Sequence, residues 1–245
     1  MGFVCALAAL ALSASAGEFS AKLRARVLPD LFVHLSAGDS GVDRGSIQAA
    51  LAESDVILLR GTVKVNVAFA DIDRRRQAGC LSALKAGIGA WHDALEGDTE
   101  FQFVDKAEDA DVCVTYVHHL MIGGMQVGGH TQWRRAVKAI GGGRYAGSVT
   151  ATVQLIADCP NGRAMNSNQM RQAACHEFGH ILGLDDSSQH GDVMGALDMR
   201  RPVTKPSPEE ISALAAVREE GRRLRTRALA FAGDENTAWA FPLGL

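Results

Sequence analysis

Residues 174–186 read ACHEFGHILGLDD, and this stretch decides how the rest of the chain is interpreted. His176 and His180 lie one helical turn apart, so both imidazoles project from the same helix face, at a separation that one zinc ion can bridge. Glu177 follows the first histidine and can reach a metal-bound water without ligating the metal. The spacing therefore predicts a helix that supplies two zinc ligands and a general base.

The residues after this helix predict a third ligand. Gly183 comes three residues after His180 and can adopt the positive φ angle that turns the chain back beneath the metal. Asp186 comes three residues later, where it can donate a carboxylate oxygen from the returning segment. His190 is the alternative ligand, although it falls four residues late for the pattern, and Asp185 is expected to support the site. We therefore expect Asp186 to complete one catalytic Zn²⁺ site with the two histidines.

The extended motif resembles the metzincin zinc-binding signature and is similar to the matrixins, whose helix reads H-E-F-G-H-x-L-G-L-D-H-S. The match runs over residues 176–185, and Asp186 stands where a matrixin has its third histidine, as in snapalysin-like enzymes. Met194 follows at the matrixin spacing to the methionine turn, a hydrophobic base beneath the metal. The resemblance covers about residues 61–217 and is specific over 174–194. It implies a zincin-like α+β domain with a twisted, mostly parallel sheet, an active-site helix, a Met-turn and a C-terminal helix.

Some residues depart from the matrixin pattern. Gly195 and Ala196 replace the Tyr-Pro pair that follows the methionine turn, so the usual wall of the family's specificity pocket does not carry over. The cysteine-switch prosegment has no counterpart, because Cys5 lies inside the expected export signal. Asp39 and Asp43 suggest Ca²⁺ only weakly, since a polar turn explains them equally well. We assign no second metal to three histidines near the place where matrixins bind a structural zinc ion: His118, His119 and His130.

Hydrophobic periodicity predicts an α+β layout. Alternation of apolar and polar residues, at period two, is typical of half-buried strands. It predicts strands over residues 63–69, 111–117 and 149–155, and glycine-rich stretches at 123–129 and 141–143 flank a further expected strand over 129–135. A helical apolar stripe covers 81–95, the motif helix is expected over 167–182 with Ser167 or Asn168 as N-cap, and the last helix begins near Ser207. Upstream, a short helix at 46–51 and a buried strand at 56–59 are expected.

The N-terminal sequence predicts export. An apolar run over residues 3–12 and the small residues that follow are typical of a signal peptide spanning 1–16, although no basic residue precedes the run and a buried Ala-rich helix is the alternative. Residues 17–60 are then an N-terminal extension or short pro-segment, 61–217 the matrixin-like domain, and 218–245 the helix end and tail. The location that follows is secreted.

Four cysteines remain after the expected signal: Cys80, Cys113, Cys159 and Cys175. In an exported protein they permit two disulfides in three connectivities, and in a cytosolic protein they would be buried thiols. A bridge from Cys159 to Cys175 would staple the connecting loop to the active-site helix. The sequence leaves this pairing open.

Composition excludes several classes of protein. The 245 residues are 47% hydrophobic and 22% charged, which argues against disorder, and a net charge of −3 gives no footprint for binding nucleic acid. No apolar run approaches the roughly 20 residues that a bilayer span needs. Three arginines on one face of the last helix are expected to be solvated, with an anionic partner as the alternative: Arg218, Arg222 and Arg225.

These observations favour a secreted, monomeric zinc metalloendopeptidase that hydrolyses protein or peptide substrates. Glu177 would act as the general base, and a substrate would pair in extended form with the strand at 129–135. The competing interpretation is a catalytically idle zinc-binding adhesion or interaction module of the same fold. Such a module would need a fourth protein ligand, for which His190 and Asp192 are candidates.

Overall fold

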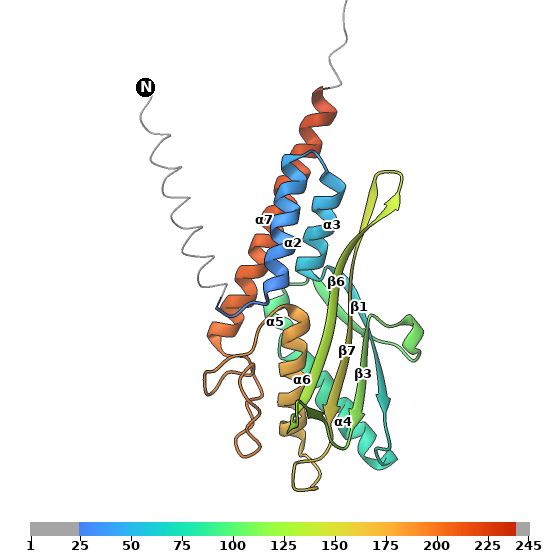
Figure 1. The fold of residues 1–245 in the computed structure, drawn as a ribbon, viewed down its shortest axis with the longest axis vertical. Coiled ribbons are helices and arrows are strands. Elements are labelled where there is room, and N and C mark those ends of the chain that lie inside the picture. The colour runs from blue at the N-terminus through green and yellow to red at the C-terminus, as the bar shows by residue number, and fades with distance from the viewer. Residues whose placement is uncertain (1–24, 239–245) are drawn as a thin grey trace, which may run out of the picture.

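The computed structural model describes residues 25–238, so the expected export signal over residues 1–16 lies outside the described residues. The described chain is an α+β protein in which helices pack along one mostly parallel sheet (Figure 1). Within the described range, no helix is both long and apolar enough to cross a membrane.

The sheet has five strands in the order β2-β1-β3-β7-β6. Neighbours are parallel except for β6, which pairs antiparallel with β7 at the sheet edge. The strands are β1 (Gly61–Phe69), β2 (Thr99–Phe103), β3 (Val112–Val117), β6 (Gly129–Gly141) and β7 (Arg144–Ile156). The predicted α+β class and mostly parallel sheet are thus confirmed.

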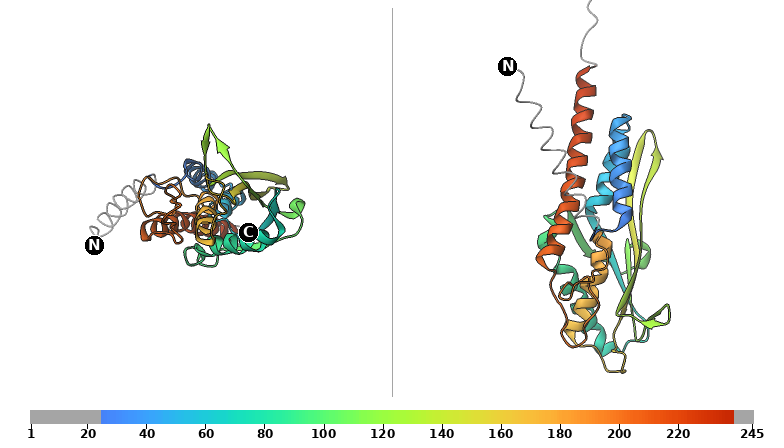
Figure 2. Two further views of the ribbon diagram at one scale, coloured as in Figure 1. Left: turned by 90° about the horizontal axis from the view of Figure 1, so that it is seen from below. Right: turned by 60° about the vertical axis from the view of Figure 1, so that its left-hand side comes forward.

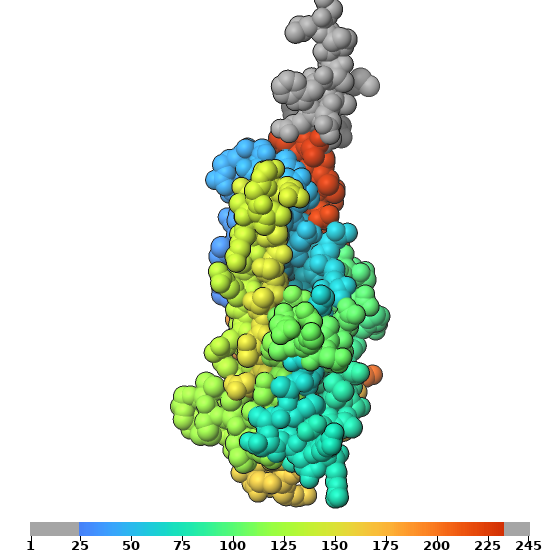
Figure 3. All heavy atoms as spheres, turned by 90° about the vertical axis from the view of Figure 1, so that its right-hand side faces the viewer, coloured from blue at the N-terminus to red at the C-terminus, as the bar shows by residue number. Residues whose placement is uncertain are grey.

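The hairpin of β6 and β7 is longer than the alternation predicts. Gly141, Gly142 and Gly143 all have positive φ angles and form its turn. Pairing between the two strands continues up to this turn, beyond the segments predicted from sequence. Gly147 on β7 lies so close to α3 (Ile47–Leu58) that a Cβ atom there would be 2.7 Å from the Ala52 carbonyl oxygen. Figure 3 shows the hairpin extending beside α2 and α3.

A smaller hairpin, β4 (Met121–Ile122) with β5 (Met125–Gln126), projects from the body of the protein (Figure 2). Its two methionines are exposed.

Two helices pack against the sheet in the larger core. α4 (Arg74–Gly89) and α6 (Ser167–Leu182) cross at Gly87, where a Cβ atom would be 2.8 Å from the Cys175 backbone nitrogen. The predicted helix over 81–95 is divided, because α4 ends at Gly89 and a short α5 (His92–Leu95) follows. Trp91 lies at the break, where its buried indole donates a 2.9 Å hydrogen bond to the Cys175 carbonyl.

The N-terminal segment is a helical hairpin of α2 (Pro29–Asp43) and α3 that packs against α7 (Pro208–Ala238). These three helices share a second apolar core and lie together beyond one end of α6 (Figures 1 and 2). The strand predicted at 56–59 is wrong, since α3 continues to Leu58. Val56 and Ile57 are buried in helical packing, which overrides their preference for strands.

The arginines of α7 are not a solvated face. Arg218 is fully buried and donates to the Leu58 carbonyl at 2.9 Å and to the Leu95 carbonyl at 3.0 Å. Two others form ion pairs with carboxylates: Arg222 with Asp98 at 2.9 Å, and Arg225 with Asp55 at 2.8 Å. The paired acids of α2, Asp39 and Asp43, both contact Arg227 of α7. The prediction of a solvated face is therefore wrong, because these arginines form hydrogen bonds and ion pairs that join α7 to the rest of the fold.

All four described cysteines are free thiols, so the considered bridge between Cys159 and Cys175 is not formed. The Cys159 thiol lies 3.8 Å from the Gln169 side-chain oxygen, near the start of α6, whereas Cys175 is buried six residues further along that helix. Six residues correspond to about 9 Å of helix.

Candidate metal centre

Local sequence determines where α6 begins and ends. Asn166 is the N-cap, one residue before the positions predicted, and it forms a capping box with Gln169: each side chain accepts from the other residue's backbone N–H, at 3.0 and 2.8 Å. Gln169 also donates to the Met199 carbonyl at 2.6 Å, which ties the helix start to the loop after the methionine turn. At the other end, Gly183 has a φ angle of 109° and turns the chain out of the helix.

The structure brings His176, His180 and Asp186 together. The Asp186 Oδ1 atom lies 3.3 Å from His176 Nε2 and 3.6 Å from His180 Nε2. One ligand atom from each residue lies within 4.8 Å of the others, so the three could hold a metal ion. His190 belongs to no such group among residues 25–238. Of the two predicted third ligands, Asp186 is the one that lies beside the histidines.

Backbone carbonyls orient both imidazoles. The Nδ1 atom of His176 lies 3.0 Å from the Val193 carbonyl oxygen, and that of His180 lies 2.9 Å from the Leu184 carbonyl oxygen. In a neutral imidazole, a proton held on Nδ1 leaves Nε2 with a lone pair that faces Asp186 and can bind a metal. In its protonated form, His176 instead donates from Nε2 to the Asp186 carboxylate. Tetrahedral zinc with bonds of about 2.0–2.1 Å separates its ligands by about 3.3 Å, and the distances from the Asp186 oxygen to the two Nε2 atoms, 3.3 and 3.6 Å, are close to that value.

The charges in this cluster follow from burial and contact. Burial lowers the pKa of His180, and the neighbouring His176 lowers it further, which favours the neutral imidazole that metals bind. Burial also lowers the pKa of His176, but the hydrogen bond to Asp186 and the nearby Glu177 raise it overall. That hydrogen bond in turn lowers the pKa of Asp186 and keeps its carboxylate ionised.

Glu177 lies beside the histidines and is buried against the edge strand β6. Thr131 donates from its hydroxyl to the carboxylate at 2.7 Å, and a Cβ atom at Gly129 would be 2.4 Å from the nearer oxygen, so only glycine allows this approach. Burial raises the pKa of Glu177, although His176 and Thr131 partly oppose the shift. The carboxylate therefore accepts a proton more readily than an exposed glutamate does. Sequence reasoning missed the contribution of Thr131.

Met194 lies beneath α6, where a Cβ atom at Gly179 would be only 2.2 Å from the methionine sulfur. Glu210 of α7 holds this turn, since its buried carboxylate accepts from the backbone N–H groups of Val193 at 3.2 Å and Met194 at 2.7 Å. The same carboxylate accepts from the Ser207 N–H at 2.6 Å. Ser207 and Glu210 form a capping pattern visible in the sequence, but the contact with the methionine turn was not predicted.

The cluster opens into a cleft of about 600 Å³ that is bounded by α6, by the edge strand β6 and by the segment after the methionine turn. Residues that line it on the β6 side include Gly129, Thr131 and Trp133, and those on the opposite side include Gly195, Ala196 and Leu197. Ile122 and Gln126 of the small hairpin also line the cleft.

No protein-family model matches this sequence, and a search of curated proteins finds no match either. The matrixin resemblance therefore depends on the residues described above.

The three histidines to which we assigned no metal lie outside this cluster. His118 forms a 2.5 Å ion pair with Asp158, and its neighbour His119 lies 3.4 Å from the Gln126 amide. His130 lies beside Gln132. Within residues 25–238 these histidines join no group of three potential metal ligands.

Proposed function

We propose that this protein is a zinc-dependent metalloendopeptidase with a metzincin, matrixin-like catalytic domain, and that it acts after secretion. The observation that carries the proposal is the convergence of two imidazole Nε2 atoms and the Asp186 carboxylate beside a buried glutamate, in an open cleft. Two histidines and a carboxylate with a free position are a donor set used by catalytic zinc sites. Secretion is supported by the sequence of residues 1–16.

The side chains divide the chemistry between them. A zinc ion bound by His176, His180 and Asp186 would supply a water of lowered pKa, about 7, and would polarise the substrate carbonyl. Glu177 takes a proton from the attacking water, because its burial and raised pKa suit a general base. It then returns that proton to the leaving amine. Thr131 keeps the carboxylate aimed into the cleft through its 2.7 Å hydrogen bond.

The substrate in this proposal is an extended peptide. Among the described residues β6 is an edge strand that pairs only with β7, and its residues Gly129, Thr131 and Trp133 line the cleft. Its free backbone groups could pair with a substrate main chain, which gives affinity without demanding a particular sequence.

The alternative of an idle zinc-binding module is less well supported, because neither predicted fourth ligand joins the cluster within residues 25–238. Asp192 is engaged by Arg26 and Ser187, each at 2.6 Å. His190 does not join the cluster. A fourth coordination position left for water is what a catalytic site requires.

Zinc-loaded protein should therefore degrade casein or gelatin, and a chelator should stop the reaction. Glu177→Ala should lose at least about 100-fold in rate, the low end for loss of a general base, while keeping its zinc. The matched control is Glu108→Ala, at a well-exposed glutamate. Hydrolysis retained by Glu177→Ala would refute the mechanism, and an X-ray absorption spectrum showing four protein ligands would favour the idle module.

A further inference from the structure

We propose that Asp30, in the N-terminal helix α2, is a positioning residue that holds the metal ligand His180 in place. The proposal rests on the function proposed above, because it concerns the same metal centre. It extends the site to a segment of the chain that lies about 150 residues before the metal ligands.

One carboxylate oxygen of Asp30 bonds two side chains of β6. It accepts from Trp133 Nε1 at 3.0 Å and from the Arg135 guanidinium at 2.6 Å. The Arg135 side chain is only 1% exposed, and Asp30 is the acid with which it forms an ion pair in the described chain. A buried guanidinium needs such a partner, so Asp30 fixes both side chains at once.

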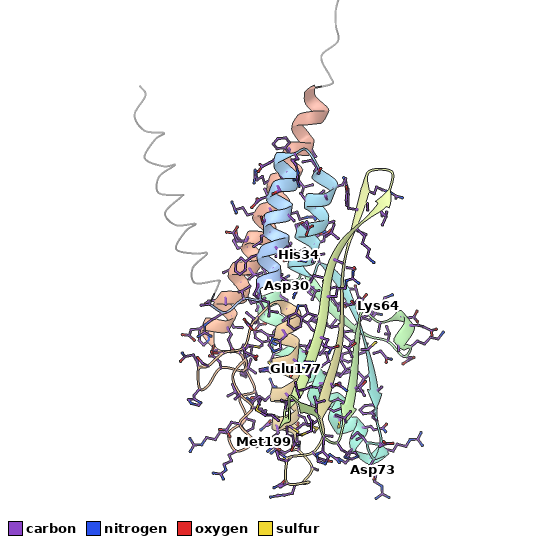
Figure 4. The ribbon with its side chains drawn as sticks, in the orientation of Figure 1. Asp30, His34, Lys64, Asp73, Glu177 and Met199 are labelled. Carbon is purple, nitrogen blue, oxygen red and sulfur yellow. The ribbon has the colours of Figure 1, made fainter. Side chains whose placement is uncertain are left out.

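Both of these side chains contact His180. The Trp133 ring stacks on the imidazole, with 5.8 Å between ring centroids and 12° between planes. The second arm of Arg135 donates to the Ile181 carbonyl at 2.6 Å and reaches the His180 carbonyl at 3.4 Å. Asp30 thus supports the ring of the ligand through Trp133 and its backbone through Arg135. Figure 4 shows Asp30 at the end of α2 that faces α6, on which Glu177 is labelled.

The residues just before Asp30 reinforce this arrangement. The Leu28 N–H donates to the Gly183 carbonyl at 2.9 Å, and the Asp185 N–H donates to the Arg26 carbonyl at 3.0 Å. The pairing encloses Leu184, whose carbonyl oxygen orients His180 Nδ1. Two contacts that fix this imidazole, the stacked Trp133 ring and the Leu184 carbonyl, therefore depend on residues 26–30 or on partners they hold.

Zinc affinity separates a positioning role from a purely structural one. Asp30→Asn removes the charge that pairs with Arg135. The group that holds both Trp133 and Arg135 is thereby weakened, and with it their contacts to His180 and the end of α6. We expect zinc affinity, measured by chelator competition on the full chain, to fall about 10- to 100-fold, as for other residues that orient metal ligands. The matched control is Asp39→Asn, on the same helix, whose carboxylate meets the part-exposed Arg227. Its zinc affinity should stay within about twofold of native.

A structural role alone would lower the melting temperatures of the zinc-free and zinc-loaded proteins equally and leave affinity unchanged, and that result overturns the proposal. If Asp30→Asn does not fold, Trp133→Leu decides, because it removes the stacked ring while leaving the ion pair. If the zinc affinity of Trp133→Leu stays within twofold of native, that result also overturns the proposal. Native protein that binds no zinc refutes the proposed function as well. Native protein that binds zinc, with Asp30→Asn unaffected, refutes only the role of Asp30.

Discussion

Arg218→Ala should destabilise the protein strongly, although the residue lies on a helix face that looks solvated in the sequence. The guanidinium donates to two backbone carbonyls, those of Leu58 at 2.9 Å and Leu95 at 3.0 Å, and lies 3.1 Å from the Asp98 carboxylate. It therefore joins the end of α3, the end of α5 and the start of β2 to α7.

The cost can be worked from these contacts. Two hydrogen bonds from a charged donor contribute at least about 1.5 kcal/mol each. The Cγ and Cδ methylenes of the buried stem, which alanine lacks, add about 0.8 kcal/mol each, for a gross loss of about 4.6 kcal/mol. Rehydrating the charge in the unfolded state offsets part of this. Both carbonyls keep a second partner, the Thr99 hydroxyl for Leu58 and the Asp98 N–H for Leu95, so no penalty for an orphaned group is added. We expect a net loss of about 3 kcal/mol.

Urea unfolding followed by tryptophan fluorescence measures this loss. The matched control is Arg223→Ala, the same substitution on the same helix, where the side chain is 61% exposed and pairs with Glu220 one turn away. Such a surface pair contributes about 0.5 kcal/mol or less. Because helix propensity changes equally in the two variants, their difference reports the buried contacts. A difference below about 1 kcal/mol would show that the reasoning is wrong.

Three further predictions concern the metal centre and its surroundings. Asp186→Ala should weaken zinc binding by more than about 100-fold in chelator competition, His190→Ala should change it little, and Asp186→His should bind at least as well as native; the reverse order for the two alanine variants would contradict the ligand assignment. Glu210→Ala leaves buried backbone N–H groups of the methionine turn unpaired and should cost about 2–4 kcal/mol in urea unfolding, and a loss under about 0.5 kcal/mol would show that the turn does not need this carboxylate. Burial raises the pKa of Asp158, but hydrogen bonds to His118 and a nearby arginine lower it overall, so its ionised form stabilises the fold above about pH 4 and this contribution is lost as pH falls. Asp158→Asn should therefore flatten the acid side of a plot of melting temperature against pH, and an unchanged acid side would exclude this pair as a cause.

The parts of the fold that follow from sequence are those governed by local rules. The strand segments at 63–69 and 149–155 follow from periodicity, because apolar residues repeat with the period of the element that buries them. The bounds of α6 follow from capping residues at its start and Gly183 at its end. β2 escaped prediction because its five residues are too few to establish a period. At residues 56–59 the sequence wrongly predicts a strand. The segment up to Leu58 is helical, because packing of α3 against α7 outweighs the strand preference of Val56.

The candidate site divides in the same way. The three candidate ligands lie within eleven residues of one another, so helix geometry and one glycine turn suffice to predict that they meet. The groups that orient them come from far away in the chain: Thr131 lies 46 residues from Glu177, and Asp30 lies 105 residues from Arg135. No spacing rule links such residues, and their roles emerge only once the sheet edge and the N-terminal helices are in place.

Two buried or part-buried carboxylates therefore have a similar task on different sides of the metal cluster. Glu210, at the start of α7, fixes the methionine turn beneath the ligands, and Asp30, at the start of α2, fixes the side chains around His180. Their helices pack on one another in the second core, which Arg218 ties to the end of α5 and to Asp98 before β2. Substitution of Arg218 should lower the stability of this frame while leaving folded protein with native zinc affinity, whereas substitution of Asp30 should lower affinity itself. Comparing the zinc affinities of the two variants at a temperature where both are folded thus separates a loss of fold stability from a loss of ligand orientation.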